Sequence, residues 1–123
     1  MKKEKYIISR AGYELEFVYD GAISQINGLW FGFCKQRKYK RRGTSKYTTW
    51  RATELSTGML VNNQDDEFLT RAEAVEFCRK STDKIYELLN SGADHVEKLK
   101  KMIKREYERC GQDEMIRRLY GEG

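Results

Sequence analysis

The sequence contains no proline, one histidine and no long run of apolar residues, and each of these absences excludes something. Without proline, the ends of helices and strands have to be marked by the ten glycines. A membrane-spanning helix needs about 20 consecutive apolar residues, and no stretch approaches that length. The first residues, MKKEKYIISRAGYE, also lack the apolar stretch of a secretion signal. We therefore expect a cytoplasmic protein without a membrane partner.

Catalytic and cofactor-binding motifs are missing as well. The single histidine, His95, is expected in the first turn of a helix, and no serine or cysteine lies in a nucleophile signature around it. The glycines form neither the G-x-G-x-x-G nor the G-x-x-x-x-G-K-[ST] pattern that holds nucleotide phosphates. We predict a protein that is not an enzyme and that has no cofactor and no small-molecule substrate.

The three cysteines, Cys34, Cys78 and Cys110, do not have the close spacing of a zinc motif or a disulfide framework. A free cysteine usually behaves as a small buried apolar residue, so we predict no metal site. The alternative is that the cysteines converge with His95 as a Cys3His zinc site. The acidic run 65–67 precedes a predicted helix, where its charge favours the helix N-terminus.

Carboxylates are absent between Asp20 and Glu54, and this gap contains most of the unbalanced charge. Residues 34–51, CKQRKYKRRGTSKYTTWR, hold eight of the 24 Lys and Arg residues, while the rest of the chain holds 16 against 19 acids. One or two such charges would protect a sheet edge from unwanted pairing, but eight repel one another and favour an anionic partner. The predicted binding residues are Lys35, Arg37, Lys38, Tyr39, Lys40, Arg41, Arg42, Lys46, Tyr47 and Arg51.

Two tyrosines within this basic segment suggest what the partner is. Tyr39 and Tyr47 stand among the cations, where their rings are expected to stack on bases while the cations neutralise phosphates. The large aromatic side chains of Trp30 and Trp50 are instead expected in the core. The sequence therefore predicts a surface for nucleic acid, either DNA or RNA, or for a nucleoprotein.

The first half of the chain has the pattern of an antiparallel sheet. Apolar and acidic residues alternate over 13–19, as in a half-buried strand. Turn residues occur at 11–12, 20–21, 27–28 and 56–58, and Asn27-Gly28 is a favoured hairpin turn. We predict a meander of five or six strands over residues 5–63, with the basic run in a long connection from Gln36 to Lys46.

The second half is expected to be helical over residues 70–120. Thr70 with Glu73 and Asp94 with Glu97 have the spacing of capping boxes at the starts of two helices. A last segment, QDEMIRRLY, is expected to add a turn or two. Apolar residues recur at helical spacing and are predicted to face the sheet: Val75, Cys78, Thr82, Ile85, Leu88, Leu89, Val96, Leu99, Ile103, Tyr107 and Cys110. The fold class is α+β, in a single domain over 1–123, with two C-terminal helices packed on the sheet.

One part of the sequence resembles a known family. The run WRATELSTGMLVNNQDDEFLTRAEAVEFC, preceded by LWFGFCKQRKYK, is similar to the amino-terminal arm-DNA-binding domain of phage-type tyrosine integrases. The likeness covers roughly residues 29–90: three strands, a Thr-Gly turn, and a helix opening with Phe68, Thr70, Glu73 and Ala74. In that family the sheet enters the DNA major groove. The resemblance implies DNA contacts near Arg37, Lys38, Tyr47, Thr49 and Arg51.

The chain departs from that family by an added N-terminal hairpin, an added C-terminal helix and the lack of a recombinase domain. Its short, basic format is also similar to that of small phage or mobile-element proteins, including anti-CRISPR proteins. We therefore expect a small non-enzymatic protein that binds nucleic acid or a nucleoprotein through its basic hairpin. The alternative is a protein inhibitor of a host nuclease that acts mainly through protein contacts, for example through the charged helix around residues 97–109.

Overall fold

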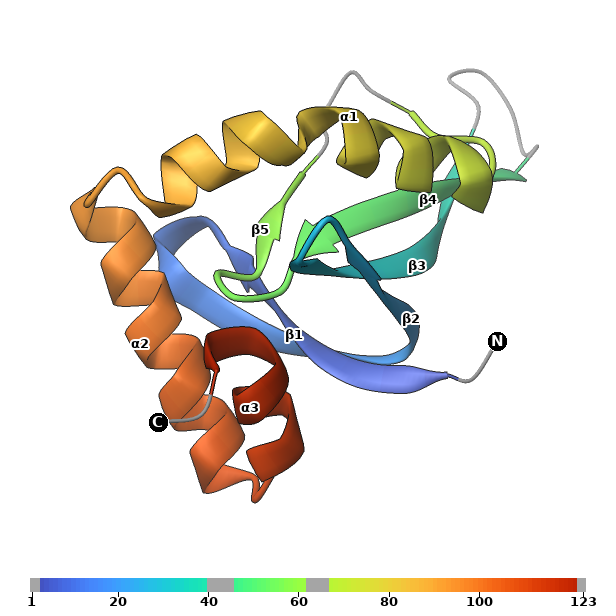
Figure 1. Ribbon diagram of the computed structural model, residues 1–123. Helices are drawn as coiled ribbons and strands as arrows, with labels where there is room; N and C mark the ends of the chain where they lie inside the picture. Colours follow the sequence, from blue (N-terminus) through green and yellow to red (C-terminus); the bar gives the residue numbers. More distant parts are fainter. Residues whose placement is uncertain (1–2, 40–45, 62–66, 122–123) are drawn as a thin grey trace.

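The computed structural model of the chain is a curled antiparallel sheet of five strands followed by three helices (Figure 1), which confirms the predicted α+β class. It describes residues 3–39, 46–61 and 67–121, without the side chains of 37–39, 46 and 47. The third helix is one more than predicted. The elements are β1 (Glu4–Arg10), β2 (Glu14–Ile26), β3 (Leu29–Tyr39), β4 (Lys46–Glu54), β5 (Met59–Leu60), α1 (Arg71–Leu89), α2 (Asp94–Arg109) and α3 (Asp113–Tyr120).

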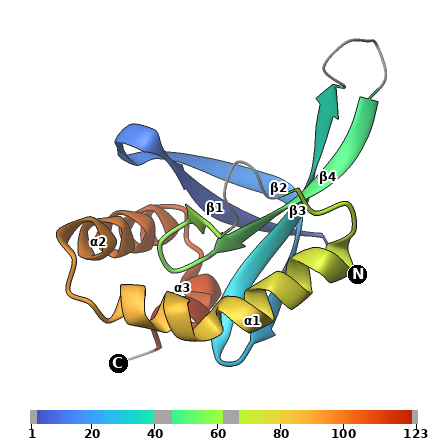
Figure 2. The ribbon, with the colours of Figure 1, turned by 90° about the horizontal axis from the view of Figure 1, so that it is seen from above.

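Strand β2 belongs to two different pairings, and this divides the sheet. Its first part pairs with β1 up to Gly21, whereas its pairing with β3 begins at Ala22. Beyond the last β2–β3 pair, Ala22 with Phe33, strand β3 pairs with β4 and with no other strand of the described part of the chain. The β1–β2 and β3–β4 hairpins consequently diverge from a common base (Figure 2).

The outer edge of β1 is covered by other parts of the fold. The backbone N–H of Ser9 donates to the carbonyl of Gly58 over 2.8 Å, so the turn after β4 closes the curled sheet against β1. The N–H of Ile7 donates to the hydroxyl of Tyr107 on α2, also over 2.8 Å. These contacts satisfy buried backbone donors that an open strand edge would leave unpaired.

The core consists of two clusters that lie on the two parts of the sheet. Helices α2 and α3 pack on β1 and β2 through the buried side chains of Ile7, Leu55, Ile103, Tyr107 and Ile116, among others. Helix α1 lies along β3 and β4 (Figure 1), where Phe31, Phe33, Ala52, Phe68 and Cys78 are buried together. Val96 of α2 joins this second cluster, so helix α2 contributes side chains to both clusters.

The residues predicted as a turn at Asp20-Gly21 instead lie inside a strand, because β2 runs without a break from Glu14 to Ile26. The reason is the Tyr6 ring, which is fully buried and lies against the backbones of Gly21 and Gly32. A Cβ atom at Gly21 would lie 2.3 Å from that ring, and one at Gly32 would lie 2.5 Å from it. Glycine is required at both positions for space rather than for a positive φ.

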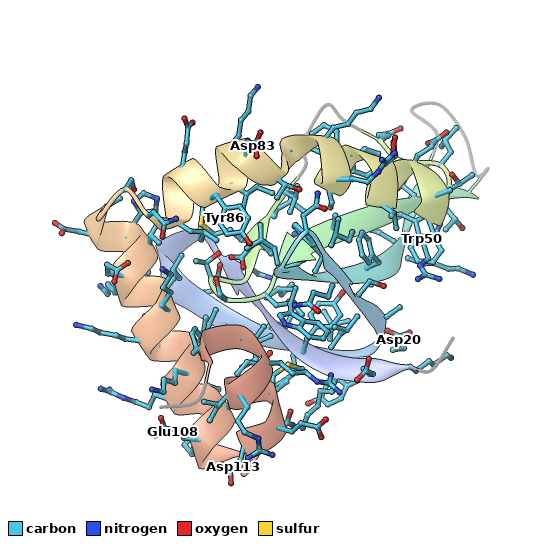
Figure 3. The ribbon with its side chains drawn as sticks, in the orientation of Figure 1. Asp20, Trp50, Asp83, Tyr86, Glu108 and Asp113 are labelled. Atoms are coloured by element: carbon cyan, nitrogen blue, oxygen red, sulfur yellow. The ribbon has the colours of Figure 1, made fainter. Side chains whose placement is uncertain are left out.

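The turn predictions at Asn27-Gly28 and at 56–58 are confirmed. Asn27 and Gly28 have φ values of 51° and 87°, as a two-residue hairpin turn requires, and the Tyr86 hydroxyl of α1 donates to the Asn27 carbonyl (Figure 3). After β4, the buried carboxylate of Glu54 accepts hydrogen bonds from the backbone N–H and the hydroxyl of both Ser56 and Thr57. These four bonds fix the turn that reaches β1.

The first predicted helix cap is confirmed and the second is wrong. The Thr70 hydroxyl accepts from the N–H of Glu73, and the Glu73 carboxylate accepts from the N–H of Leu69. Helix α2 instead has Ala93 as its N-cap, without a side-chain hydrogen bond, so Asp94 is already the first helical residue.

Two members of the predicted apolar stripe do not face the sheet. Leu88 is 38% exposed, and the neighbouring Leu89 is buried in its place. Cys110 lies at the C-cap of α2, where the helix has ended, and is exposed. Among the described residues, no helix is both long enough and apolar enough to cross a membrane.

Candidate functional site

The β3–β4 hairpin carries the predicted basic segment away from the rest of the sheet (Figure 2). The ladder pairs Gln36 with Thr49 and continues to Tyr39 with Lys46. The predicted long connection from Gln36 to Lys46 is therefore too long, because the strands extend into it from both ends. A strand ladder is stiffer than a loop, so this segment leaves the domain as a two-stranded ribbon.

The structure distributes the ten predicted binding residues over this ribbon and its base. Lys35 is exposed and Arg51 is half-buried, and both lie near the point where the ribbon leaves the sheet. Five others belong to the paired strands by their backbone: Arg37, Lys38, Tyr39, Lys46 and Tyr47. The remaining three, Lys40, Arg41 and Arg42, lie outside the described residues.

A pocket of about 290 Å³ at the base of the ribbon gathers basic side chains around an indole ring. Its lining includes Lys3, Lys35 and Arg71, with Trp50 beside them and Asp20 as the acidic member. Trp50 lies on β4 near the beginning of α1, and Asp20 lies on β2 near the beginning of β1 (Figure 3). The pocket thus combines three cations and one carboxylate with the aromatic rings of Trp50 and Phe33.

Two features of this pocket are typical of an anion-binding surface. The Lys35 ammonium lies 5.7 Å from the centre of the Trp50 ring, within the range of a cation–π interaction. The Nε atom of Arg71 is buried and has no hydrogen-bond partner among residues 3–39, 46–61 and 67–121. A buried donor without an acceptor is costly, and an anionic oxygen in the pocket would relieve that cost.

Trp50 is held in place by the backbone rather than by deep burial. The backbone N–H of Trp50 donates to the carbonyl of Phe68 over 2.7 Å. The Trp50 ring is half-buried at the edge of the second core cluster. The expectation that Trp50 belongs to the core is therefore only partly met, because one part of the ring remains open to the pocket. Arg71 begins α1 immediately after the Thr70 cap, which fixes its backbone position.

A second and larger hollow, of about 560 Å³, separates the two diverging hairpins. Its lining includes Cys34, whose thiol lies beside the hydroxyl of Tyr6. Burial raises the pKa of the Tyr6 phenol, and the neighbouring Cys34 raises this pKa further, so Tyr6 is neutral at physiological pH. A neutral, fully buried tyrosine supports the structure at the point where the β1–β2 and β3–β4 hairpins diverge, which we call the fork.

The alternative zinc site is not formed. Cys34 is half-buried on β3, Cys78 is buried on the inner face of α1, Cys110 is exposed at the end of α2, and all three are free thiols. Burial raises the pKa of the Cys78 thiol to about 12, which makes it unreactive. Across residues 3–39, 46–61 and 67–121, no group of three or more His, Cys, Asp or Glu side chains has the arrangement of a metal site.

The charged face of α2, the alternative contact surface, contains six Lys and Arg residues, two of which form ion pairs among the described residues. Lys100 forms an ion pair with Glu97, and Arg109 forms one with Glu106. On the ribbon base, in contrast, neither Lys35 nor Arg51 belongs to an ion pair among the described residues. Helix α2 carries four acids among its six Lys and Arg residues, whereas residues 34–51 carry none among eight, so α2 presents a weaker field to an anionic partner than the ribbon.

The sequence prediction missed Lys3 and Arg71, because their place beside Lys35 arises only from tertiary packing. Lys3 precedes β1 and Arg71 begins α1, so neither adjoins the basic segment in sequence. Comparison of the chain with protein-family models, with curated proteins and with solved structures finds no match.

Proposed function

We propose that this chain binds nucleic acid through its β3–β4 ribbon, with the cations contacting phosphates. The observation that carries the proposal is the projection of the ribbon from the domain (Figure 2), together with a sequence that has eight cations and no acid over residues 34–51. A projecting ribbon is accessible from both sides and has the dimensions of a groove-binding element.

The pocket at the ribbon base supports the same proposal. A phosphate oxygen in this pocket accepts from the unpartnered Nε of Arg71 and lies near the ammonium of Lys35. The open part of the Trp50 ring offers a surface on which a base or sugar stacks. The pocket thus extends the phosphate-binding surface from the ribbon to the body of the domain.

A salt titration with a 20-nucleotide single strand and a 20-base-pair duplex, both of random sequence, tests the proposal. Each phosphate contact on duplex DNA contributes about −0.9 to the slope of log affinity against log salt, so four contacts predict a slope of about −3.6. Replacement of Lys40, Arg41 and Arg42 by alanine should flatten this slope by about 2 to 3 units. Binding should weaken similarly for all sequences, since phosphate contacts carry little base information.

The matched control replaces three exposed cations of α2, Lys101, Lys104 and Arg105, by alanine. This variant removes the same net charge from a different surface, so its slope should stay within about one unit of the unmodified protein. Equal losses in the two variants would indicate nonspecific attraction by net charge. No binding of either probe at low salt would refute the proposal.

A further inference from the structure

The hollow between the two diverging hairpins has backbone walls as well as side-chain walls. Its lining includes Phe17 and Tyr19 of β2 on one side and Lys35, Gln36 and Arg51 of the β3–β4 ribbon on the other. Strand order places β2 and β3 next to each other, yet their pairing ends at Ala22 with Phe33. The two strands therefore present facing edges to this hollow, which we call the groove.

The direction of the backbone groups on the β3 edge follows from the ladder with β4. The N–H of Trp50 donates to Phe68, away from β3. In an antiparallel ladder, both members of such a pair direct their N–H and C=O groups outward. Since Trp50 pairs with Lys35, the N–H and C=O of Lys35 point into the groove.

The same reasoning applies to the β2 edge. The N–H of Ile7 donates to Tyr107, away from β2, and Ile7 pairs with Phe17. The N–H and C=O of Phe17 therefore also point away from β1 and toward the groove. A strand edge of this kind is usually covered or paired, because it is a template for another strand.

We propose that the groove binds an extended acidic peptide of a partner protein, which adds a strand to the free edge of β3. Main-chain hydrogen bonds to Lys35 supply affinity, as in other cases of strand addition. A strand residue occupies roughly 160 Å³ from its rise, strand spacing and sheet spacing, so a groove of about 560 Å³ holds about three or four residues.

Charge and exposed aromatic surface select the kind of peptide. The Arg10 and Glu16 side chains at the groove neutralise each other in an ion pair. Lys35 and Arg51 take part in no ion pair among the described residues and outnumber the one remaining acid of the lining, Asp20, so they favour acidic side chains on the peptide. Tyr19, which is 69% exposed at the groove, offers a contact for an apolar side chain. This groove shares Lys35 with the pocket around Trp50 and Arg71 but includes neither of those two residues, and strand addition to the β3 edge does not require nucleic-acid binding.

The probe for this proposal is an octapeptide of alternating glutamate and valine, with alternating lysine and valine as the charge control. The glutamate peptide should bind at least about tenfold more tightly. In hydrogen exchange, the amides of Lys35 and Gln36 form a matched pair in the free protein. The Lys35 amide should exchange fast in the free protein and slowly once the peptide is added. The Gln36 amide, which is hydrogen-bonded to β4, should exchange slowly in both states.

Lys35→Pro and Lys35→Thr separate the backbone contact from the charge. Both replacements remove the lysine charge, and proline in addition removes the N–H that faces the groove. Proline is tolerated at such an edge position. Proline should lower the affinity for the glutamate peptide at least about tenfold. Threonine keeps the N–H and should lower this affinity by about two- to fivefold. Thermal unfolding verifies that each variant is folded.

Equal weakening by proline and threonine, or equal binding of the two peptides, would overturn the proposal. Unchanged exchange at Lys35 with saturating glutamate peptide would do the same, even if the proline variant failed to fold. Peptide binding without any binding of nucleic acid would leave this inference intact and refute only the proposed function.

Discussion

Replacement of Gly32 by alanine should destabilise the protein through a clash with Tyr6 at the base of the fork. The new Cβ would lie 2.5 Å from Tyr6 Cζ and under 3.0 Å from two other ring atoms, against 3.4–4 Å for ordinary contact. The ring is fully buried, so it has no open space into which to move. Overpacking of this severity costs about 3 kcal/mol, while the lower entropy of the unfolded chain returns about 0.7 kcal/mol.

The expected net loss is therefore about 2 kcal/mol in the free energy of unfolding, measured by urea denaturation. Tyr6→Leu provides the matched background, since it shortens the side chain that the new methyl group meets. In that background, Gly32→Ala should be neutral or slightly stabilising, which gives a coupling energy of about 2 kcal/mol in a double-mutant cycle. The same loss in both backgrounds would show that Tyr6 is not the reason for glycine at this position.

Four further predictions concern the core packing and the turn after β4. Tyr107→Phe leaves the N–H of Ile7 without an acceptor and should cost about 1 to 3 kcal/mol in urea unfolding. Burial also raises the pKa of Tyr107, so its stabilisation is complete below pH 10 and is lost as the pH rises further; the urea midpoint should fall there, less steeply in the phenylalanine variant. Glu54→Gln leaves two of four donors without an acceptor and should cost about 1 to 3 kcal/mol. Leu89→Ala should cost about 2 to 5 kcal/mol, against about 0.5 kcal/mol for Leu88→Ala; similar losses would place both side chains on one face.

The fold class could be predicted because local signals agree with it. Alternation over β2, the Asn27-Gly28 turn and the Thr70 cap are each specified by a few neighbouring residues, and the structure confirms all three. Asp20-Gly21 has the same composition as a turn, yet lies inside a strand. Gly21 makes room for Tyr6, a residue of a different strand, and the residues next to Gly21 in the sequence do not indicate that contact.

The candidate site was only partly predictable for the same reason. The charge of residues 34–51 is visible in the sequence, and the ribbon that carries it follows from two adjacent strands. The pocket at its base depends on Lys3 before β1 and Arg71 at the start of α1. The fold brings both next to Trp50 of β4. The groove between the hairpins depends on where β2 changes partner from β1 to β3, and Ala22 carries no mark of that change.

The central claim, that the β3–β4 ribbon binds nucleic acid, is tested most directly by amide NMR of the labelled protein during titration with a 20-nucleotide single strand at low salt. The account predicts that the largest shift changes fall on Lys35 and Arg51 and along the strands between them, with the Arg71 side-chain Nε–H also shifted. The amides of α2 from Lys101 to Arg105 should change little. Changes confined to α2, or none at a strand concentration of 1 mM, about ten times the weakest typical nonspecific Kd, would contradict the account.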